Sequence, residues 1–460
     1  MYSCPETTWP NGVTLWKPLL LMPTPAPAPT VPRLTYLRIK NYRALRDVEF
    51  RDLTPLTVLI GPNGSGKSTV LDALDFLAEA VSGNMVQAWA TRNRFAGMRT
   101  RGTKGGILFE LEAKLSLHGA RFRYYLEIDE VDGHVIVKKE WLKAIEKQRK
   151  KHSDDIITDV FSVVGAFNKT HNAVRVRYQN QFIADKGVEY WETKDEGGIG
   201  ILKYEPMLSA TKILKVSFGA LTTVLRKMVE GYRYIHLTDD HLKGYSDAGP
   251  REKLSPNGDN LPNVLYYLYT KHRETLAKIT GQMQRWVPGL ADIAPEITSD
   301  ERILLRFRDA PFEKPLPAQY MSAGTMRLAA LLTLLYEPDA AGLLGMEEPE
   351  NELHPQLLAY LAEELITATD TRQLLVATHS PALLNALQPE QVWILHRGAD
   401  GYTQATRTAD LPGIPAMVEE GTPLGYLWSR NFFDVGNPSI CPPRFNNADP
   451  GRFSGRGDFS

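Results

Sequence analysis

The sequence predicts an α/β protein with a mixed β-sheet core and flanking helices, and three patterns support this fold class. From residue 322 to residue 397, helix-like and strand-like segments alternate, which is the pattern of parallel strands joined by crossover helices. A glycine-rich loop at 61–66 stands between an apolar strand and an amphipathic helix. Residues 107–140 contain strand-like segments with short turns, as in an antiparallel meander. We therefore expect the core to carry an antiparallel β subdomain and a helical insertion.

The segments divide the chain in order. Residues 1–33 are rich in proline, which favours an extended backbone, and we interpret them as a disordered leader; a true start at Met22 is the alternative. Residues 34–140 hold three short strands, the glycine-rich loop, a helix from about 69 to 81 and the meander. We assign 141–320 to an insertion with helices near 205–231 and 260–286. Residues 321–425 complete the core, and 426–460 are expected to form a loose tail.

Composition restricts the class of protein. The chain has 460 residues, of which 43% are hydrophobic and 23% charged, so disorder throughout is excluded. The two cysteines, Cys4 and Cys441, lie far apart, which excludes a disulfide framework and a four-cysteine zinc site. No stretch approaches 18 uninterrupted apolar residues, so we expect no membrane span. The predicted location is the cytoplasm, with no membrane partner.

A complete phosphate-binding motif follows the third predicted strand. It matches G-x-x-x-x-G-K-[ST] and comprises Gly61, Pro62, Asn63, Gly64, Ser65, Gly66, Lys67, Ser68 and Thr69. Glycines let backbone amides turn toward phosphates, and the following helix adds positive charge at its N-terminus. We expect Lys67 to reach the β and γ phosphates of ATP and Ser68 to offer its hydroxyl to Mg²⁺. ATP and Mg²⁺ are therefore the predicted cofactors.

Polar side chains follow two later strands of the predicted sheet. A triphosphate site needs acidic residues that hold Mg²⁺ and orient water, normally at the end of a neighbouring apolar strand. The strand at 342–346 is followed by Glu347, which we assign to the metal, and Glu348, which we assign to polarising the attacking water. The strand at 373–378 is followed by His379, at the sheet edge where ligands bind. We expect His379 to contact the γ-phosphate as a second catalytic residue.

Five segments extend this pattern along the chain: IKNYRALRDVEF, GPNGSGKST, YMSAGTMRLAALL, MEEPENELHPQL and VATHSPALLNAL. Their order and spacing resemble the ABC-type ATPase heads of the RecF, SMC and OLD-like class, P-loop NTPases often labelled AAA-type ATPases. The resemblance covers about 34–120 and 315–425 in pieces. It implies an ABC-ATPase head that hydrolyses ATP, with Glu347 and Glu348 as the Walker B acids and His379 as the switch histidine. It departs at Glu347, where aspartate is usual.

The same resemblance implies a signature loop before the helix at 325–336. Ser322 and Gly324 match that loop, whereas Ala323 and Thr325 replace the usual glycine and glutamate. In this class the signature loop caps ATP bound by a second subunit, so the resemblance implies a homodimer that sandwiches two ATP molecules. A Ser-Ala-Gly turn that opens a helix also forms an anion site of its own from backbone amides.

Three functions compete for the ATPase. The first is a DNA-associated switch in genome maintenance or antiphage defence that controls a separately encoded effector such as a nuclease. The second is the nucleotide-binding subunit of an ABC transporter, which the IKNYRAL strand and the SAGT loop oppose. The third is a nuclease with a fused TOPRIM domain; only 63 residues follow Arg397 and they contain no Asp-x-Asp pair, so that function fails within this chain.

Two basic clusters are candidates for contact with DNA. Residues 91–104 carry Arg92, Arg94, Arg99, Arg101 and Lys104 without an acidic residue, and residues 138–152 carry seven Lys or Arg against two Glu. Such clusters neutralise phosphates along a duplex and make binding salt-dependent. A solvated basic face balanced by acids elsewhere is the equal alternative, because the formal net charge of the chain is only -1.

Overall fold

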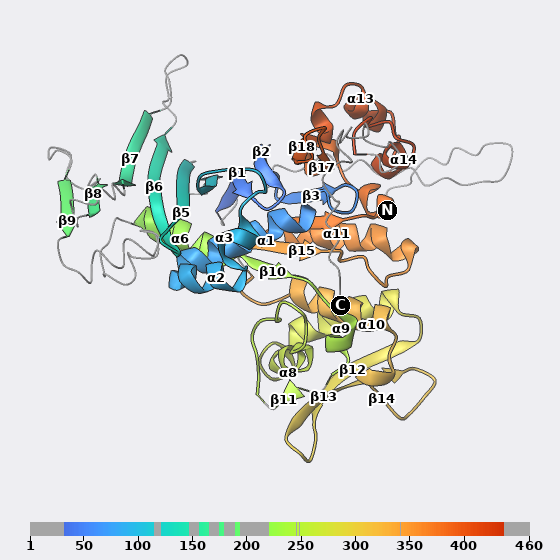
Figure 1. The fold of residues 1–460 in the computed structure, drawn as a ribbon. Coiled ribbons are helices and arrows are strands. Elements are labelled where there is room, and N and C mark those ends of the chain that lie inside the picture. The colour runs from blue at the N-terminus through green and yellow to red at the C-terminus, as the bar shows by residue number, and fades with distance from the viewer. Residues whose placement is uncertain are drawn as a thin grey trace, which may run out of the picture.

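The computed structural model confirms the α/β fold class and its antiparallel subdomain (Figure 1). It describes residues 32–114, 121–146, 156–164, 174–178, 189–193, 220–244, 246–247, 249–340 and 342–436. The predicted leader up to residue 31 and the tail from residue 437 lie outside the described residues.

A six-stranded sheet forms the centre of the protein. Its strands are, in order across the sheet, β10 (Arg233–Ile235), β15 (Leu343–Glu347), β16 (Gln373–Thr378), β3 (Leu56–Ile60), β17 (Val392–Arg397) and β18 (Thr403–Arg407). The first five are parallel, and β18 pairs antiparallel with β17. Every residue of β3 and β16 is buried, as expected for parallel strands covered on both faces. Their C-terminal ends therefore meet at one edge of the sheet.

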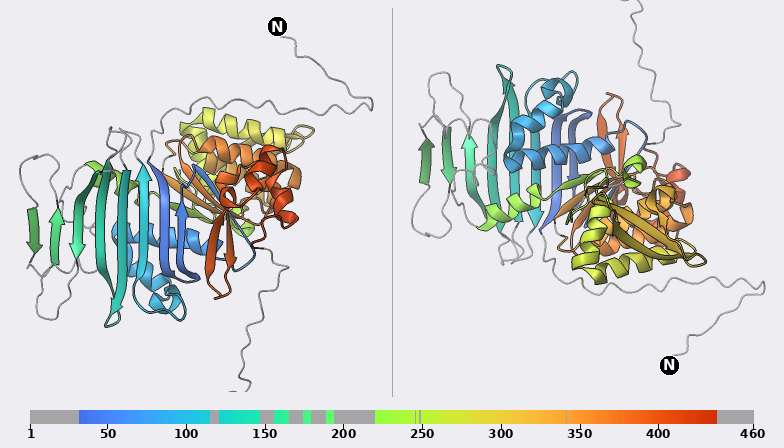
Figure 2. Two further views of the ribbon diagram at one scale, coloured as in Figure 1. Left: turned by 90° about the horizontal axis from the view of Figure 1, so that it is seen from above. Right: turned by 90° about the horizontal axis from the view of Figure 1, so that it is seen from below.

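An eight-stranded antiparallel sheet extends from one side of this centre. Its order is β2 (Leu45–Arg51), β1 (Arg33–Tyr42), β4 (Ile107–Lys114), β5 (Arg121–Val131), β6 (His134–Glu146), β7 (Ile156–Val164), β8 (Val174–Tyr178) and β9 (Glu189–Thr193). Alternate residues of β5 are buried, which is the pattern of a sheet with one face on the core. Figure 2 shows helices across that face: α1 (Lys67–Glu79), α2 (Met85–Thr91), α3 (Arg94–Met98) and α6 (Ala220–Glu230).

The opposite face of the central sheet packs against a second group of elements (Figure 1). The helices of this group are α7 (Asp239–Leu242), α8 (Leu261–Lys271), α9 (Arg273–Trp286), α10 (Ala323–Leu335), α11 (Leu358–Ala368), α12 (Pro381–Leu384), α13 (Ile414–Glu419) and α14 (Leu424–Ser429). The same group includes a small sheet, which is formed by β11 (Ser246–Asp247), β12 (Leu290–Ile297), β13 (Arg302–Asp309) and β14 (Leu316–Pro317).

Side-chain alternation in the central strands creates two hydrophobic cores. In β3, Leu59 belongs to the core shared with α1 and the antiparallel sheet, whereas Val58 and Ile60 belong to the core shared with α10 and α11. Successive side chains of a strand point to opposite faces, so one strand stabilises both layers. The central sheet is thereby held between the two groups of helices.

The segment 141–320 differs from the helical lobe predicted for it. The helices near 260–286 are present as α8 and α9, and α6 lies within the predicted 205–231. However, β6 runs to residue 146 and pairs with β7, β10 joins the central sheet, and β12 pairs with β13. Leu142, Ala144 and Ile145 are buried within the basic segment that begins at residue 138, and the pairing of β6 with β5 continues through them. The insertion contributes strands to all three sheets.

The start of the predicted tail is also ordered. The sequence predicts a loose tail from 426, but α14 continues to Ser429 and Phe433 is only 2% exposed. Leu424, Leu427 and Phe433 are buried with the helices of the second core. Burial of these apolar side chains stabilises the segment through residue 436.

Candidate nucleotide-binding site

A cleft of about 820 Å³ lies where three central strands end. β3 leads into the glycine-rich loop, β15 ends at Glu347, and β16 ends just before His379. The residues that line the cleft are Ala44, Asn63, Gly64, Gly66, Lys67, Ser68, Thr69, Glu347, Glu348, Asn351, His379 and Arg397. The edge formed by the C-terminal ends of parallel strands is where α/β sheets bind ligands. The structure thus brings most of the predicted site residues together.

The loop at 61–66 wraps around the side chain of Lys67. Lys67 Nζ donates to the carbonyl oxygens of Gly61 at 2.9 Å and Pro62 at 3.4 Å. Gly61 passes close to β17, where a Cβ would lie 2.0 Å from the Leu395 carbonyl oxygen, so only glycine fits. Burial lowers the pKa of Lys67 to about 8, although Glu348 and Glu347 favour its charged form. Ser65 is buried and does not line the cleft.

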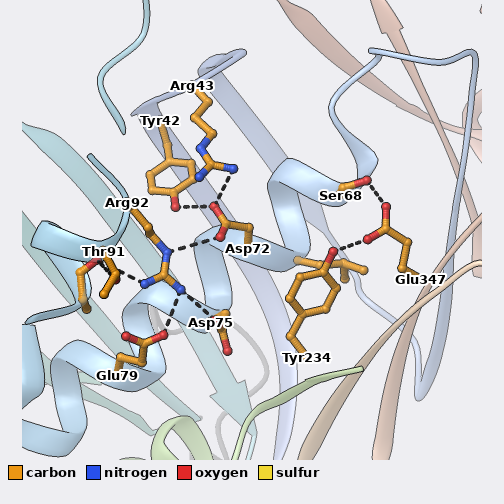
Figure 3. A network of polar contacts seen from close by, with 12 residues as sticks. Tyr42, Arg43, Ser68, Asp72, Asp75, Glu79, Thr91, Arg92, Tyr234 and Glu347 are labelled. Atoms are coloured by element: carbon orange, nitrogen blue, oxygen red, sulfur yellow. Dashed lines mark hydrogen bonds and ion pairs between the residues drawn. The ribbon is translucent and has the colours of Figure 1, made fainter. Parts of the chain in front are cut away.

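Glu347 makes a direct contact with the start of α1 (Figure 3). Ser68 Oγ donates a hydrogen bond to Glu347 Oε1, although 279 positions separate the two residues. The other carboxylate oxygen, Oε2, accepts a hydrogen bond from the Tyr234 hydroxyl and lies 3.3 Å from His236 Nδ1. Both of these partners come from β10 or the residue just beyond it. The Ser68–Glu347 pair is therefore bordered by β10.

These oxygens suit a magnesium ion. Mg²⁺ prefers oxygen ligands and is usually bound by one or two protein groups together with waters and substrate phosphates, rather than by a closed protein cage. Ser68 and Glu347 supply a hydroxyl and a carboxylate side by side. The described part of the chain contains no group of three or more His, Cys, Asp or Glu residues placed to hold a metal ion.

Glu348 has a left-handed backbone with φ 44°, an unusual conformation for a non-glycine residue. Its amide donates to the Ala377 carbonyl at 2.8 Å, and its carbonyl accepts from Arg327 Nη2 at 2.6 Å. These contacts fix the strained position from two directions. Burial, together with the nearby Glu350, raises the pKa of Glu348 to about 8.

His379 stands between the lysine and the second acid. Its Nε2 lies 2.8 Å from Lys67 Nζ and 3.4 Å from Glu348 Oε1. Its backbone amide faces Glu350 Oε1 at 3.2 Å and Glu348 Oε2 at 3.3 Å. Burial and the charge of Lys67 lower the pKa of His379, which favours the neutral imidazole. A neutral ring can donate one hydrogen bond and accept another.

The predicted signature loop lies outside the cleft. Ser322 caps α10, because its hydroxyl accepts from the Thr325 amide at 3.1 Å. Gly324 packs tightly against the segment after β15, since a Cβ there would lie 2.5 Å from the Glu352 carbonyl oxygen. Neither Ser322 nor Gly324 is among the residues that line the cleft.

The first basic cluster is divided. Arg94, Arg101 and Lys104 are exposed, whereas Arg92 and Arg99 are partly buried and paired with carboxylates; Figure 3 shows the contacts of Arg92. The Arg92 side chain is 9% exposed and contacts Asp72, Asp75 and Glu79 of α1 at 3.2, 2.7 and 2.9 Å. Arg92 therefore anchors the end of α2 to α1, and for this residue the contacts favour the alternative of a cation balanced by acids. Arg99 pairs with Asp129 at 3.2 Å.

The second cluster is partly neutralised where it is described. Lys138 pairs with Glu127 at 2.8 Å, and it also lies 3.7 Å from Asp129. Lys139 is exposed above the ring of Tyr125. Residues 147–152 lie outside the described residues.

Four side chains at the site have no role assigned to them by the sequence motifs described above. Tyr234 and His236 reach Glu347 only because β10 pairs with β15. Arg397 lines the cleft and donates from Nε to the Gly64 carbonyl at 2.9 Å. Arg327 had one available signal: it is a single charged residue in the otherwise apolar helix α10, where a buried cation needs several acceptors.

Two family descriptions match this chain. "AAA ATPase domain" matches residues 33–248, and "AAA domain, putative AbiEii toxin, Type IV TA system" matches residues 232–385. The first match includes Lys67 and Ser68, and the second includes Glu347, Glu348 and His379.

Two curated proteins are similar over parts of the chain. DNA repair protein RecN from Aquifex aeolicus is 24% identical over 271 residues, which are 54% of this chain and 51% of RecN. OLD nuclease from Thermus scotoductus is 48% identical over 44 residues, which are 10% of this chain and 8% of that protein. The chain thus spans about half the length of one relative and a small part of the other.

Solved structures with partial likeness include an SMC head bound to the C-winged helix domain of ScpA, with 13% identity, coverage of 81% of this chain and 97% of that chain, and a TM-score of 0.43. The SMC head domain from Thermotoga maritima has 13% identity, coverage of 82% of this chain and 98% of that chain, and a TM-score of 0.38.

Within the described ranges, no helix combines the length and apolar character needed to cross a membrane.

Proposed function

We propose that this chain is an ATP-hydrolysing AAA-type P-loop ATPase of the RecF, SMC and OLD-like class, and that it binds ATP with Mg²⁺ in the cleft between the glycine-rich loop, Glu347 and His379. One observation carries the assignment of the site. Lys67, Ser68, Glu347, Glu348 and His379 come from three distant segments of the sequence and converge on one sheet edge. Such convergence is what phosphoryl transfer requires, because its catalysis consists mainly of positioning and charge stabilisation.

Each residue has a distinct role in this proposal. The loop amides and Lys67 bind the β and γ phosphates, and Lys67 leaves its contacts with Gly61 and Pro62 to do so. Ser68 and Glu347 hold Mg²⁺, which neutralises phosphate charge when bound. Glu348 orients the attacking water as a carboxylate, and the backbone contacts of Glu348 keep that carboxylate in place. His379 bonds to the γ-phosphate from beside Lys67.

Paired substitutions test the site. Lys67→Ala should lower the affinity for a fluorescent ATP analogue at least tenfold, since a main partner of the phosphates is lost. Glu348→Gln should keep that affinity and lower turnover about 100-fold or more. Lys278→Ala and Glu363→Gln are matched controls on exposed positions of α9 and α11. Unchanged ATP affinity in Lys67→Ala would refute the loop assignment, and unchanged turnover in Glu348→Gln would refute the catalytic role.

The active form in this proposal is a homodimer that sandwiches two ATP molecules. Ser322 and Gly324 open α10 away from their own cleft, so we assign them to the γ-phosphate held by a second copy. ATP then binds the dimer better than the monomer and shifts the population toward the dimer. Light scattering of Glu348→Gln should show a larger mass with ATP than without it. A mass that ATP leaves unchanged would count against the ATP-driven dimer.

The output we propose is control of a separately encoded effector in a DNA-associated process in the cytoplasm. The names of the similar proteins, DNA repair protein RecN and OLD nuclease, support a DNA-related process and a nuclease as the effector. The transporter alternative has no support from these relatives. Binding of a labelled duplex should weaken as salt rises, with ATP present. Binding that is absent at low salt would refute the DNA association, and genes that neighbour the coding sequence would identify the effector.

A further inference from the structure

Strand β10 places two side chains on one oxygen of Glu347. The Tyr234 hydroxyl donates to Oε2, and His236 Nδ1 lies 3.3 Å from the same atom. The other oxygen, Oε1, accepts from Ser68. Figure 3 shows Ser68 and Tyr234 each at a different oxygen of the carboxylate. Three contacts therefore determine the orientation of one acidic side chain.

The position of β10 follows from its pairing with β15. Tyr234 lies opposite Gly345 and Ile235 opposite Met346, so the residue after β10 reaches the level of Glu347. Parallel strands in register carry their side chains in step, which places Tyr234 and His236 beside the acid. Both come from the insertion, far from the glycine-rich loop in sequence.

Tyr232 anchors the same strand to α1. Its hydroxyl donates to the Leu71 carbonyl at 3.0 Å, and its ring is buried. Gly345 provides the space, because a Cβ there would lie 2.1 Å from the Tyr232 hydroxyl. β10 is thus attached both to the helix that follows the phosphate loop and to the carboxylate at the end of β15. A strand held at both places is a rigid support for the Tyr234 hydroxyl.

We propose that Tyr234 and His236 are positioning residues for Mg²⁺ binding, an inference that rests on the proposed ATPase site. They hold Oε2 of Glu347, so that Oε1 stays beside the Ser68 hydroxyl and the two oxygens face the cation together. Groups that orient a metal-binding carboxylate typically change metal affinity about 10–100-fold when they are removed. Tyr234 provides the hydroxyl contact and His236 a second contact to the same oxygen.

The test separates cation binding from nucleotide binding. Tyr234→Phe keeps the ring and removes the hydroxyl, and it is made in the Glu348→Gln background so that ATP is not consumed. Affinity for a fluorescent ATP analogue is measured across a Mg²⁺ titration and in excess EDTA. Electron paramagnetic resonance of Mn²⁺ in the presence of ATP counts the bound cation directly. Tyr36→Phe is the matched control, since its hydroxyl donates to Glu49 at 2.6 Å on the antiparallel sheet.

We expect Tyr234→Phe to need about tenfold more Mg²⁺ or Mn²⁺, with the EDTA affinity unchanged. His236→Ala added to Tyr234→Phe should raise the requirement further, and Tyr36→Phe should leave it at the parental value. An unchanged cation requirement in Tyr234→Phe would overturn the proposal, as would an equal loss of affinity in EDTA. If Mg²⁺ does not change the ATP affinity of the parental Glu348→Gln protein, the assigned Mg²⁺ site itself is refuted. Lys67→Ala tests separately whether the cleft binds ATP.

Discussion

Replacing Arg327 by methionine should slow turnover while leaving ATP affinity nearly intact. Arg327 is only 3% exposed, and its guanidinium donates to the carbonyl oxygens of Glu348 at 2.6 Å, Leu237 at 3.1 Å and Pro349 at 3.4 Å. Two of these carbonyls belong to the turn that holds the catalytic candidate Glu348 at φ 44°. Methionine fills a similar volume but provides no donor.

The geometry sets the size of the effect. A hydrogen bond from a charged donor contributes about 1.5–3 kcal/mol, so the two shorter contacts together represent about 3–6 kcal/mol. Removing a buried cation recovers part of its desolvation cost, which leaves a net loss of about 2–4 kcal/mol in the free energy of unfolding. The left-handed conformation of Glu348 costs about 1–3 kcal/mol, so without its support the turn should relax. A displacement near 1 Å corresponds to a kcat lower by about 10–100-fold.

Urea unfolding, steady-state turnover and binding of a fluorescent ATP analogue measure the three quantities on the same preparations. Arg372→Met is the matched control, because Arg372 is a similarly buried arginine that precedes β16, at the sheet edge opposite the cleft. It should lower stability and leave kcat unchanged. If Arg327→Met loses stability but keeps its kcat within twofold of the parent, Arg327 does not position Glu348.

Three further predictions concern the pH profile of turnover, the ion pairs of Arg92 and the composite ATP site. The pH profile of kcat/KM should be a narrow bell centred near pH 8, because Glu348 is protonated below about 8 and Lys67 loses its proton above about 8. Glu350 raises the pKa of Glu348, so Glu350→Gln should move the acid limb of the bell to lower pH. A flat profile from pH 6 to 9 would contradict the roles of both Glu348 and Lys67. Arg92→Leu should cost about 3–5 kcal/mol of unfolding free energy in urea, since three carboxylates of α1 lose their shared cation, and a loss below 1 kcal/mol would argue against that role. Mixing Lys67→Ala with Ser322→Arg subunits should restore part of the turnover that each lacks alone, because one composite site per heterodimer stays intact; no recovery would contradict the sandwich.

Local patterns in the sequence identified the parts of the site that depend on contiguous residues. The run from Gly61 to Thr69 specifies its own loop, because glycine spacing and the helix start lie within a few residues of each other. The apolar strands that lead to Glu347 and His379 were also predicted from sequence, because a fully buried parallel strand is a nearly continuous apolar run. Because these strands were predicted to be parallel, their C-terminal ends were expected at the ligand-binding edge of the sheet.

Tertiary structure alone decided which side chains meet across that edge. Tyr234 and His236 reach Glu347 through the pairing of β10 with β15, and no local periodicity in a three-residue strand reports its neighbour. The basic residue Arg92 resembled a surface cation in sequence, yet three carboxylates of α1 surround it. The sequence placed Phe433 in a loose tail, whereas the structure buries it in the second hydrophobic core. A short stretch of chain encodes its backbone conformation through nearby sterics and periodicity, whereas burial and pairing depend on surfaces that only the folded layers bring together.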